Sequence, residues 1–134
     1  MEGVLAATRI QLTTTTVAQL SAFVDDQSLT TFVARTTPPW SWLPRLLGAG
    51  AVTLGRNVTF REGRYNETTP RGLALIAHEC VHVRQYREMG AVSFLLAYGR
   101  GAIQSRFVHA RHPLEIEANL LQKRVREALE PAQS

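Results

Sequence analysis

The sequence predicts a mainly helical α+β fold in one domain spanning residues 1–134. Apolar residues recur at helical spacing in several segments, and one short segment near the middle alternates apolar and polar residues as a strand does. A chain of 134 residues suffices for one hydrophobic core and is short for two. We therefore expect four or five helices around a single core, with a small β element before the central helix.

The N-terminal half is expected to hold a helix, an irregular segment and the β element. Residues 17–34 carry apolar side chains at helical spacing with a break near Asp25, and the threonines just before them can cap a helix. Residues 36–44 hold three prolines and two tryptophans, which excludes regular structure there. Between residues 46 and 60 the pattern alternates on both sides of a Gly-Arg-Asn sequence, which predicts two short strands or one bent strand.

Three helices are expected after these strands. Thr69 suits an N-cap, Pro70 suits the first helical position and Gly90 suits the position after the last turn, so they delimit a central helix that is apolar on several sides and therefore buried. Residues 91–107 form a weaker helical pattern, interrupted by two glycines. A last helix begins at Pro113 and ends before Pro131, with a core-facing stripe at Leu114, Ala118, Leu121, Val125 and Ala128.

The central helix contains the chemically most informative motif, His78-Glu79-Cys80-Val81-His82. Two histidines four residues apart project from one helix face and can chelate one Zn²⁺, while Glu79 can reach a metal-bound water without being a ligand. Buried imidazoles need partners for their ring nitrogens, and a metal satisfies one nitrogen of each. Cys80 points away from this face, so we expect an inert core thiol.

A catalytic zinc site takes three protein ligands and keeps a fourth position for water, so another ligand must come from elsewhere in the chain. The longer pattern H-E-x-x-H-x-x-G-x-x-H is not continued, because Gln85 and Glu88 stand where its glycine and third histidine belong. From the residues alone, four candidates for the third ligand remain: Glu115, Glu117, His109 and His112.

Together with Glu115-Ile116-Glu117-Ala118-Asn119, the motif resembles the gluzincin zinc peptidases, and the short chain resembles the minigluzincin kind of domain over roughly residues 51–119. In that family a glutamate on a second helix is the third ligand, within the pattern Glu-x-x-(small)-(Asp/Asn). Glu115, Ala118 and Asn119 match this register, whereas Glu117 does not.

This resemblance implies a zincin-like fold with His78, His82 and Glu115 as Zn²⁺ ligands. It further implies that Asn119 orients a ligand histidine from outside the ligand set. In larger gluzincins an edge strand just before the metal-binding helix binds the substrate backbone, and residues 52–60 stand at the corresponding place. The alternative is a hairpin that only covers the core.

The predicted function is that of a zinc metallopeptidase, a hydrolase acting on a peptide or protein substrate with Glu79 as general base. The tetrahedral intermediate needs a further donor, for which Tyr98, His109, Arg111 and His112 are candidates. The alternative is a zinc-stabilised binding or structural module, or an inactive peptidase relative. A fourth protein ligand, such as His109 or His112, would favour that alternative over an open position for water.

Charge and composition limit the remaining classes. The formal net charge is +4, but the arginines are scattered and no nucleic-acid motif accompanies them, so no nucleic-acid partner is expected. We see no signal peptide, the longest apolar window is too short for a transmembrane segment, and a single cysteine suits a reducing compartment, which together predict a cytoplasmic protein. Trp40 and Trp42 are expected to cover their own core. A peptidase of this size has little surface with which to enclose and select a substrate. A partner protein or a larger assembly is therefore a further alternative.

Overall fold

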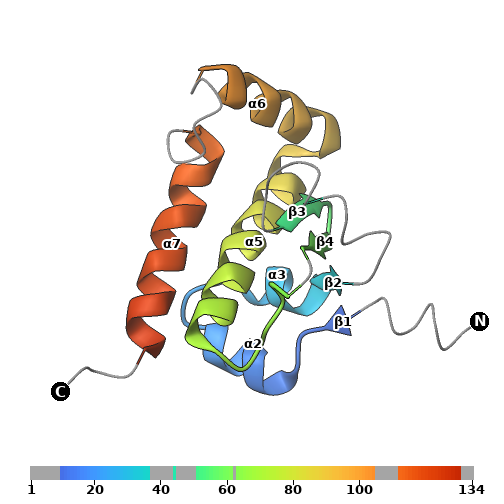
Figure 1. The fold of residues 1–134 in the computed structure, drawn as a ribbon. Coiled ribbons are helices and arrows are strands. Elements are labelled where there is room, and N and C mark those ends of the chain that lie inside the picture. The colour runs from blue at the N-terminus through green and yellow to red at the C-terminus, as the bar shows by residue number, and fades with distance from the viewer. Residues whose placement is uncertain (1–9, 37–43, 45–50, 62, 105–111, 131–134) are drawn as a thin grey trace, which may run out of the picture.

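The computed structural model describes residues 10–36, 44, 51–61, 63–104 and 112–130. Figure 1 shows a small sheet and helix α7 on opposite sides of helix α5, with α6 crossing near one end of both helices. The fold is therefore mainly helical α+β, as the sequence predicts, and α5 forms its centre. The tryptophan-containing segment lies outside the described residues.

The first expected helix is in fact two short helices followed by a strand. Helix α2 covers Thr14–Leu20 and is capped by Thr13, while α3 covers Asp26–Thr31 and is capped by Asp25, whose carboxylate accepts from the backbone N–H of Ser28. The prediction of a helix up to residue 34 was wrong, because Val33–Arg35 forms strand β2. These residues pair in parallel with a strand more than twenty positions later in the chain. Such long-range pairing overrides a local helical pattern.

The β element is a four-stranded sheet with the order β1-β2-β4-β3. Strands β3 (Ala51–Leu54) and β4 (Asn57–Phe60) form an antiparallel hairpin, so of the two predicted alternatives the two short strands are correct and the single bent strand is not. Gly55 has φ +67° in the turn, a conformation that glycine adopts without steric cost. Strand β1 (Ile10–Gln11) pairs with β2. In this order β1 and β3 are the two edge strands of the described sheet.

Helix α5 covers Pro70–Met89, with Thr69 as N-cap, Pro70 in the first turn and Gly90 at the C-terminal end, as predicted. Its apolar residues contact the sheet on one side and α7 on another, so most of the helix is buried. The core is built around it from both helices and strands, with its largest fully buried side chains at Phe32, Phe60, Leu20, Leu29 and Ile76.

Two helices follow α5. Helix α6 covers Ala91–Gln104, and the rest of the segment predicted as helical lies outside the described residues. Helix α7 covers Pro113–Leu129 and buries Ala118 and Val125 of the predicted stripe, whereas Ala128 at its end is exposed. Apolar side chains of α6 also face solvent, including Val92, Leu96 and Ile103. Within the described ranges, no helix combines the length and apolar character that crossing a bilayer requires.

Candidate metal centre

Helix α5 brings three of the predicted site residues together. His78 and His82 lie one turn apart on the same face, with ring centroids 5.1 Å apart, and Glu79 lies beside them. All three side chains are buried. The helix can carry polar groups at this depth only if each is hydrogen-bonded or bound to a metal, because burying an unsatisfied polar group is costly.

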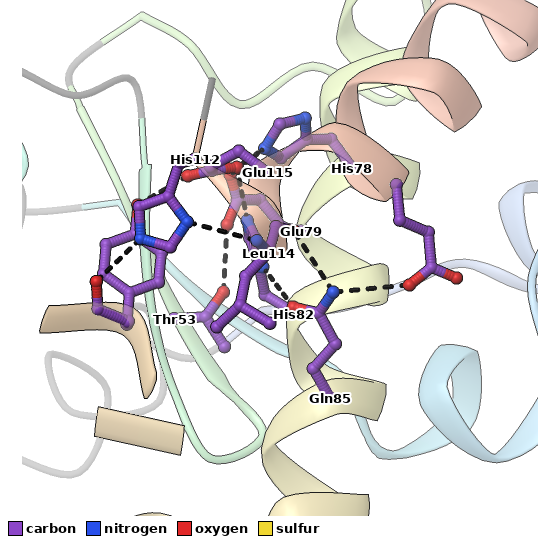
Figure 2. Close-up of polar contacts among 10 residues, drawn as sticks. Thr53, His78, Glu79, His82, Gln85, His112, Leu114 and Glu115 are labelled. Atoms are coloured by element: carbon purple, nitrogen blue, oxygen red, sulfur yellow. Dashed lines mark hydrogen bonds and ion pairs between the residues drawn. The ribbon is translucent and has the colours of Figure 1, made fainter. Parts of the chain in front are cut away.

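Helix α7 supplies a further site residue, Glu115, from its first turn. Glu115 is 2% exposed, and its Oε1 lies 2.9 Å from Nε2 of His78 and 2.7 Å from Nε2 of His82 (Figure 2). These contacts span 37 and 33 positions of sequence. The packing of α7 against α5 is therefore what completes the cluster.

The cluster of His78, His82 and Glu115 could hold a metal ion. One donor atom from each residue lies within 4.8 Å of the other two, and all three residues are buried. Two imidazole nitrogens and a carboxylate oxygen are donors that zinc takes in catalytic sites. The donor set, its convergence and its burial thus fit a divalent metal of that class.

His82 is strongly influenced by its neighbours. Burial lowers the pKa of this imidazole, but the hydrogen bond that it donates to Glu115, the charges of Glu79 and Glu115 and the bond to Gln85 outweigh it and raise the pKa to about 9. A metal bound at Nε2 has to replace the proton that this pKa implies at neutral pH.

Glu79 lies next to the cluster without belonging to it. Its Oε1 is 4.0 Å from Nε2 of His78, and its Oε2 accepts a hydrogen bond of 2.9 Å from the hydroxyl of Thr53 on strand β3 (Figure 2). Thr53 was not singled out from the sequence. Its position in a strand that alternates apolar and polar residues gives no sign that its hydroxyl reaches Glu79 on α5.

Gln85 is a second residue that sequence reasoning missed. It follows His82 by one turn of α5, and its Oε1 lies 2.8 Å from Nδ1 of that histidine. Its Nε2 donates to the carbonyl oxygen of Leu114 at 3.1 Å and lies 3.4 Å from Oε1 of Glu117. The i, i+3 spacing within a buried helix was the signal available in the sequence.

Tyr98 of α6 approaches the cluster from a third direction. Its hydroxyl donates to Oε2 of Glu115 at 2.5 Å, and its ring lies edge-on to that of His82. Burial, the bond to Glu115 and the nearby charges of Glu115 and Glu79 raise the pKa of the phenol above its ordinary value. Tyr98 therefore remains a protonated hydrogen-bond donor throughout the physiological range.

His112 joins α6 to α7. Its Nδ1 accepts from the backbone N–H of Leu114, and its Nε2 lies 2.7 Å from the carbonyl oxygen of Tyr98. A ring that accepts at Nδ1 and faces a carbonyl at Nε2 carries its proton on Nε2. Both nitrogens are thus engaged by the backbone. Gly101 permits this approach, because a Cβ there would lie 2.7 Å from Cε1 of His112.

The other predicted residues are less central. Glu117 is exposed and pairs with Arg84, so that Glu115 is the glutamate in the cluster. Asn119 is half-buried, and its predicted role of orienting a ligand histidine stays a prediction; Nδ1 of His82 is engaged by Gln85. Cys80 is fully buried, and burial raises the pKa of its thiol, as expected for an inert cysteine. His109 and Arg111 lie outside the described residues.

Comparison with known proteins yields one family. The model of the eCIS core domain, a domain found in extracellular contractile injection systems, matches residues 11–90. The matched range contains the sheet and the whole of α5 with both histidines, and it ends before α6 and α7. No curated protein matches the chain significantly. No solved structure does so either.

Proposed function

This chain belongs to the eCIS core domain family, and we propose that it is a zinc-dependent peptidase. One observation carries the proposal: two histidines and a glutamate converge in a buried cluster, and a second glutamate stands beside them outside the ligand set. A purely structural site has no need of Glu79 in that place, whereas hydrolysis needs a base next to the metal-bound water.

The ligand arrangement supports the resemblance to gluzincins. The third ligand comes from the helix and the register that the gluzincin pattern requires, with Glu115 in the first turn of α7. Ala118, one turn further along, is fully buried, and a small residue there lets α5 and α7 approach closely.

Each of these residues would have a defined task. Zinc, when bound, supplies an acidified water and polarises the carbonyl of the scissile bond. Glu79 would take the proton of that water and pass it to the leaving amine. Thr53 would hold the other oxygen of Glu79 and so fix the direction in which the carboxylate accepts.

Among the candidate donors to the tetrahedral intermediate, Tyr98 is best placed in the described part of the chain. Its phenol is protonated and lies within hydrogen-bond distance of Glu115. Both nitrogens of His112 are already committed to backbone groups. We therefore assign the donor role to Tyr98, which would turn from Glu115 towards the developing oxyanion.

Strand β3 offers a surface for the substrate backbone. It lies at the edge of the described sheet, and its Thr53 contacts Glu79. An extended peptide added to this edge would run past the general base, and its main chain would be held by strand-type hydrogen bonds.

The second candidate function is a non-catalytic zinc module that works within a larger assembly. Family membership favours it, because the matched domain is found in extracellular contractile injection systems. In that case the metal would hold α7 against α5, and a fourth protein ligand would close the site.

Metal content and hydrolysis together test the proposal. Elemental analysis of the purified protein is expected to give about one zinc per chain, and a labelled casein or a peptide library is expected to be cleaved. Glu79→Gln should keep the zinc and lower the rate of hydrolysis by a factor of about 10²–10⁴. His82→Ala should lose both zinc and hydrolysis.

Glu88→Gln, an exposed change on the same helix, serves as the matched control and should leave zinc and hydrolysis unchanged. A protein that never binds zinc would overturn the proposal. Full hydrolysis by Glu79→Gln would remove the general-base assignment. Stoichiometric zinc without hydrolysis of any substrate would favour the structural module.

A further inference from the structure

The side chain of Gln85 has a fixed orientation. Its two ends meet chemically different partners, namely Nδ1 of His82 at 2.8 Å and the carbonyl oxygen of Leu114 at 3.1 Å. A carbonyl oxygen only accepts, so the amide nitrogen of Gln85 must face Leu114 and its oxygen must face His82. Glu117 on the same side as Leu114 offers a further acceptor at 3.4 Å, which favours the same orientation.

This orientation determines which ring nitrogen of His82 carries a proton. Because Oε1 of Gln85 can only accept, Nδ1 of His82 has to carry a proton. The neutral imidazole then has its lone pair on Nε2, the nitrogen that lies 2.7 Å from Oε1 of Glu115 within the cluster. That is the tautomer in which a histidine can give Nε2 to a metal.

The other end of the amide acts on the third ligand. Leu114 directly precedes Glu115 in the first turn of α7, so its carbonyl moves with the backbone that carries the carboxylate. The bond from Gln85 thus joins α5 to α7 at the point where Glu115 enters the cluster (Figure 2). At 7% exposure the amide is protected from competition by water.

We propose that Gln85 is the positioning residue of the metal centre. The oxygen of its side-chain amide fixes His82 with Nε2 free for the metal, and the nitrogen of that amide fixes the distance between α5 and the start of α7. The inference rests on the proposed function and adds to it a residue that neither the metal motif nor the gluzincin pattern contains.

Two substitutions separate the two ends of the amide. Gln85→Met keeps the approximate length of the side chain and removes both hydrogen bonds. Gln85→Glu keeps an acceptor for His82 and loses the donor to Leu114. Gln104→Met, at the exposed end of α6, is the matched control.

The first readout is zinc affinity, measured by competition with a chelator of known affinity. Gln85→Met should bind zinc about 10–100-fold more weakly than the wild type, as is usual when the hydrogen-bond partner of a ligand histidine is removed. Gln85→Glu should restore most of the affinity, while its zinc-stripped form unfolds at a lower denaturant concentration than the wild type. Gln104→Met should match the wild type in both measurements.

The second readout is the imidazole N–H of His82 in zinc-loaded protein, observed by ¹⁵N-resolved NMR. In the wild type the proton should sit on Nδ1 and exchange slowly, and in Gln85→Met it should exchange rapidly. A role limited to packing would lower stability without moving this signal. The wild-type spectrum alone tests the inference if Gln85→Met does not fold, because a proton on Nε2 would overturn it.

The outcomes distinguish this inference from the proposed function. Wild-type protein that binds no zinc would overturn both. Zinc binding that is equally tight in the wild type and in Gln85→Met, with the same slow exchange, would overturn the role of Gln85 and leave the metal site standing.

Discussion

The two halves of the candidate metal centre are built in different ways. The α5 half consists of His78, Glu79 and His82, which fall within five consecutive residues and inside the range that matches the family. The other half, Tyr98 and Glu115, comes from two further helices beyond that range. The first half depends on the geometry of one helix, whereas the second depends on how α6 and α7 are placed against that helix.

This difference affects how each half is held. Helix α5 has its own caps and is embedded in the core, so its side chains keep their positions through local structure. Helix α7 reaches the cluster by packing along α5, and the side-chain contacts of His112 and Tyr98 join α6 and the start of α7 to it. Single substitutions should therefore disturb the second half more selectively than the first.

The largest effect is expected at Glu115, the proposed ligand that joins the two halves. Glu115→Gln keeps the size of the side chain but replaces a carboxylate with a weak ligand, so zinc should be lost on dialysis against a chelator. Glu117→Gln is the matched control and should retain zinc, because Glu117 is exposed and pairs with Arg84. Elemental analysis measures both. The opposite pattern would move the third ligand to Glu117.

The next effect concerns the α6 contribution. Tyr98→Phe removes the hydroxyl that donates to Glu115, and it should lower kcat by about 10²–10³ if this hydroxyl stabilises the oxyanion. Zinc content should be unchanged. Tyr86→Phe, on α5 beside Phe94, should leave kcat unchanged. Equal kcat in the wild type and in Tyr98→Phe would remove Tyr98 from the mechanism.

The contact between α6 and α7 can be tested with two glycines of the same helix. In Gly101→Ala the new Cβ would meet the ring of His112 at 2.7 Å, which should lower the free energy of unfolding by about 1–3 kcal/mol. In Gly99→Ala nothing lies within 4 Å, and the higher helix propensity of alanine should raise it by up to about 1 kcal/mol. Denaturant unfolding measures both. Equal effects at the two positions would contradict the close approach of His112.

The smallest effect lies at the far end of α5, where Arg87 binds Asp25. Burial raises the pKa of Asp25, but the hydrogen bonds from Ser28 and the bond and charge of Arg87 outweigh it, and the pKa lies below the ordinary 3.8. The lowered pKa adds stability above pH 3.8, and this stability is lost as the pH falls through the folded-state value.

Asp25→Asn should therefore weaken the loss of stability between pH 7 and pH 3, by at most about 1 kcal/mol because the pair is partly exposed. Denaturant unfolding at the two pH values measures the difference. An identical loss in the wild type and in Asp25→Asn would show that the pair contributes nothing.

Much of the fold followed from local patterns. The caps Thr69 and Pro70 and the end at Gly90 define α5 in the sequence and in the structure alike. Alternation predicted strands at β3 and β4 but left two short strands and one bent strand open, and the structure shows two paired strands. Residues 33 and 34 were assigned to the end of a helix but lie in β2, since the partner of this strand is β4 and no local pattern reveals it.

The site divides along the same line. Helical periodicity alone places His78 and His82 on one face with Glu79 beside them, because neighbours three or four apart on a helix share a face. The choice of Glu115 from the residues alone stayed open between four candidates. The gluzincin pattern pointed to Glu115, and the structure places this residue in the cluster. Thr53 and Gln85 were missed, because their contacts with Glu79 and with Leu114 run between separate elements.

The sequence by itself determined the motif helix, its limits and the spacing of its two histidines, since all of these depend on residues within a few turns of each other. Only the tertiary structure decided which carboxylate meets the histidines, which hydroxyl holds Glu79 and which amide holds His82. Those contacts depend on the packing of α6, α7 and β3 around α5. Packing of this kind is set by the shape of the whole core, and no short stretch of sequence contains it.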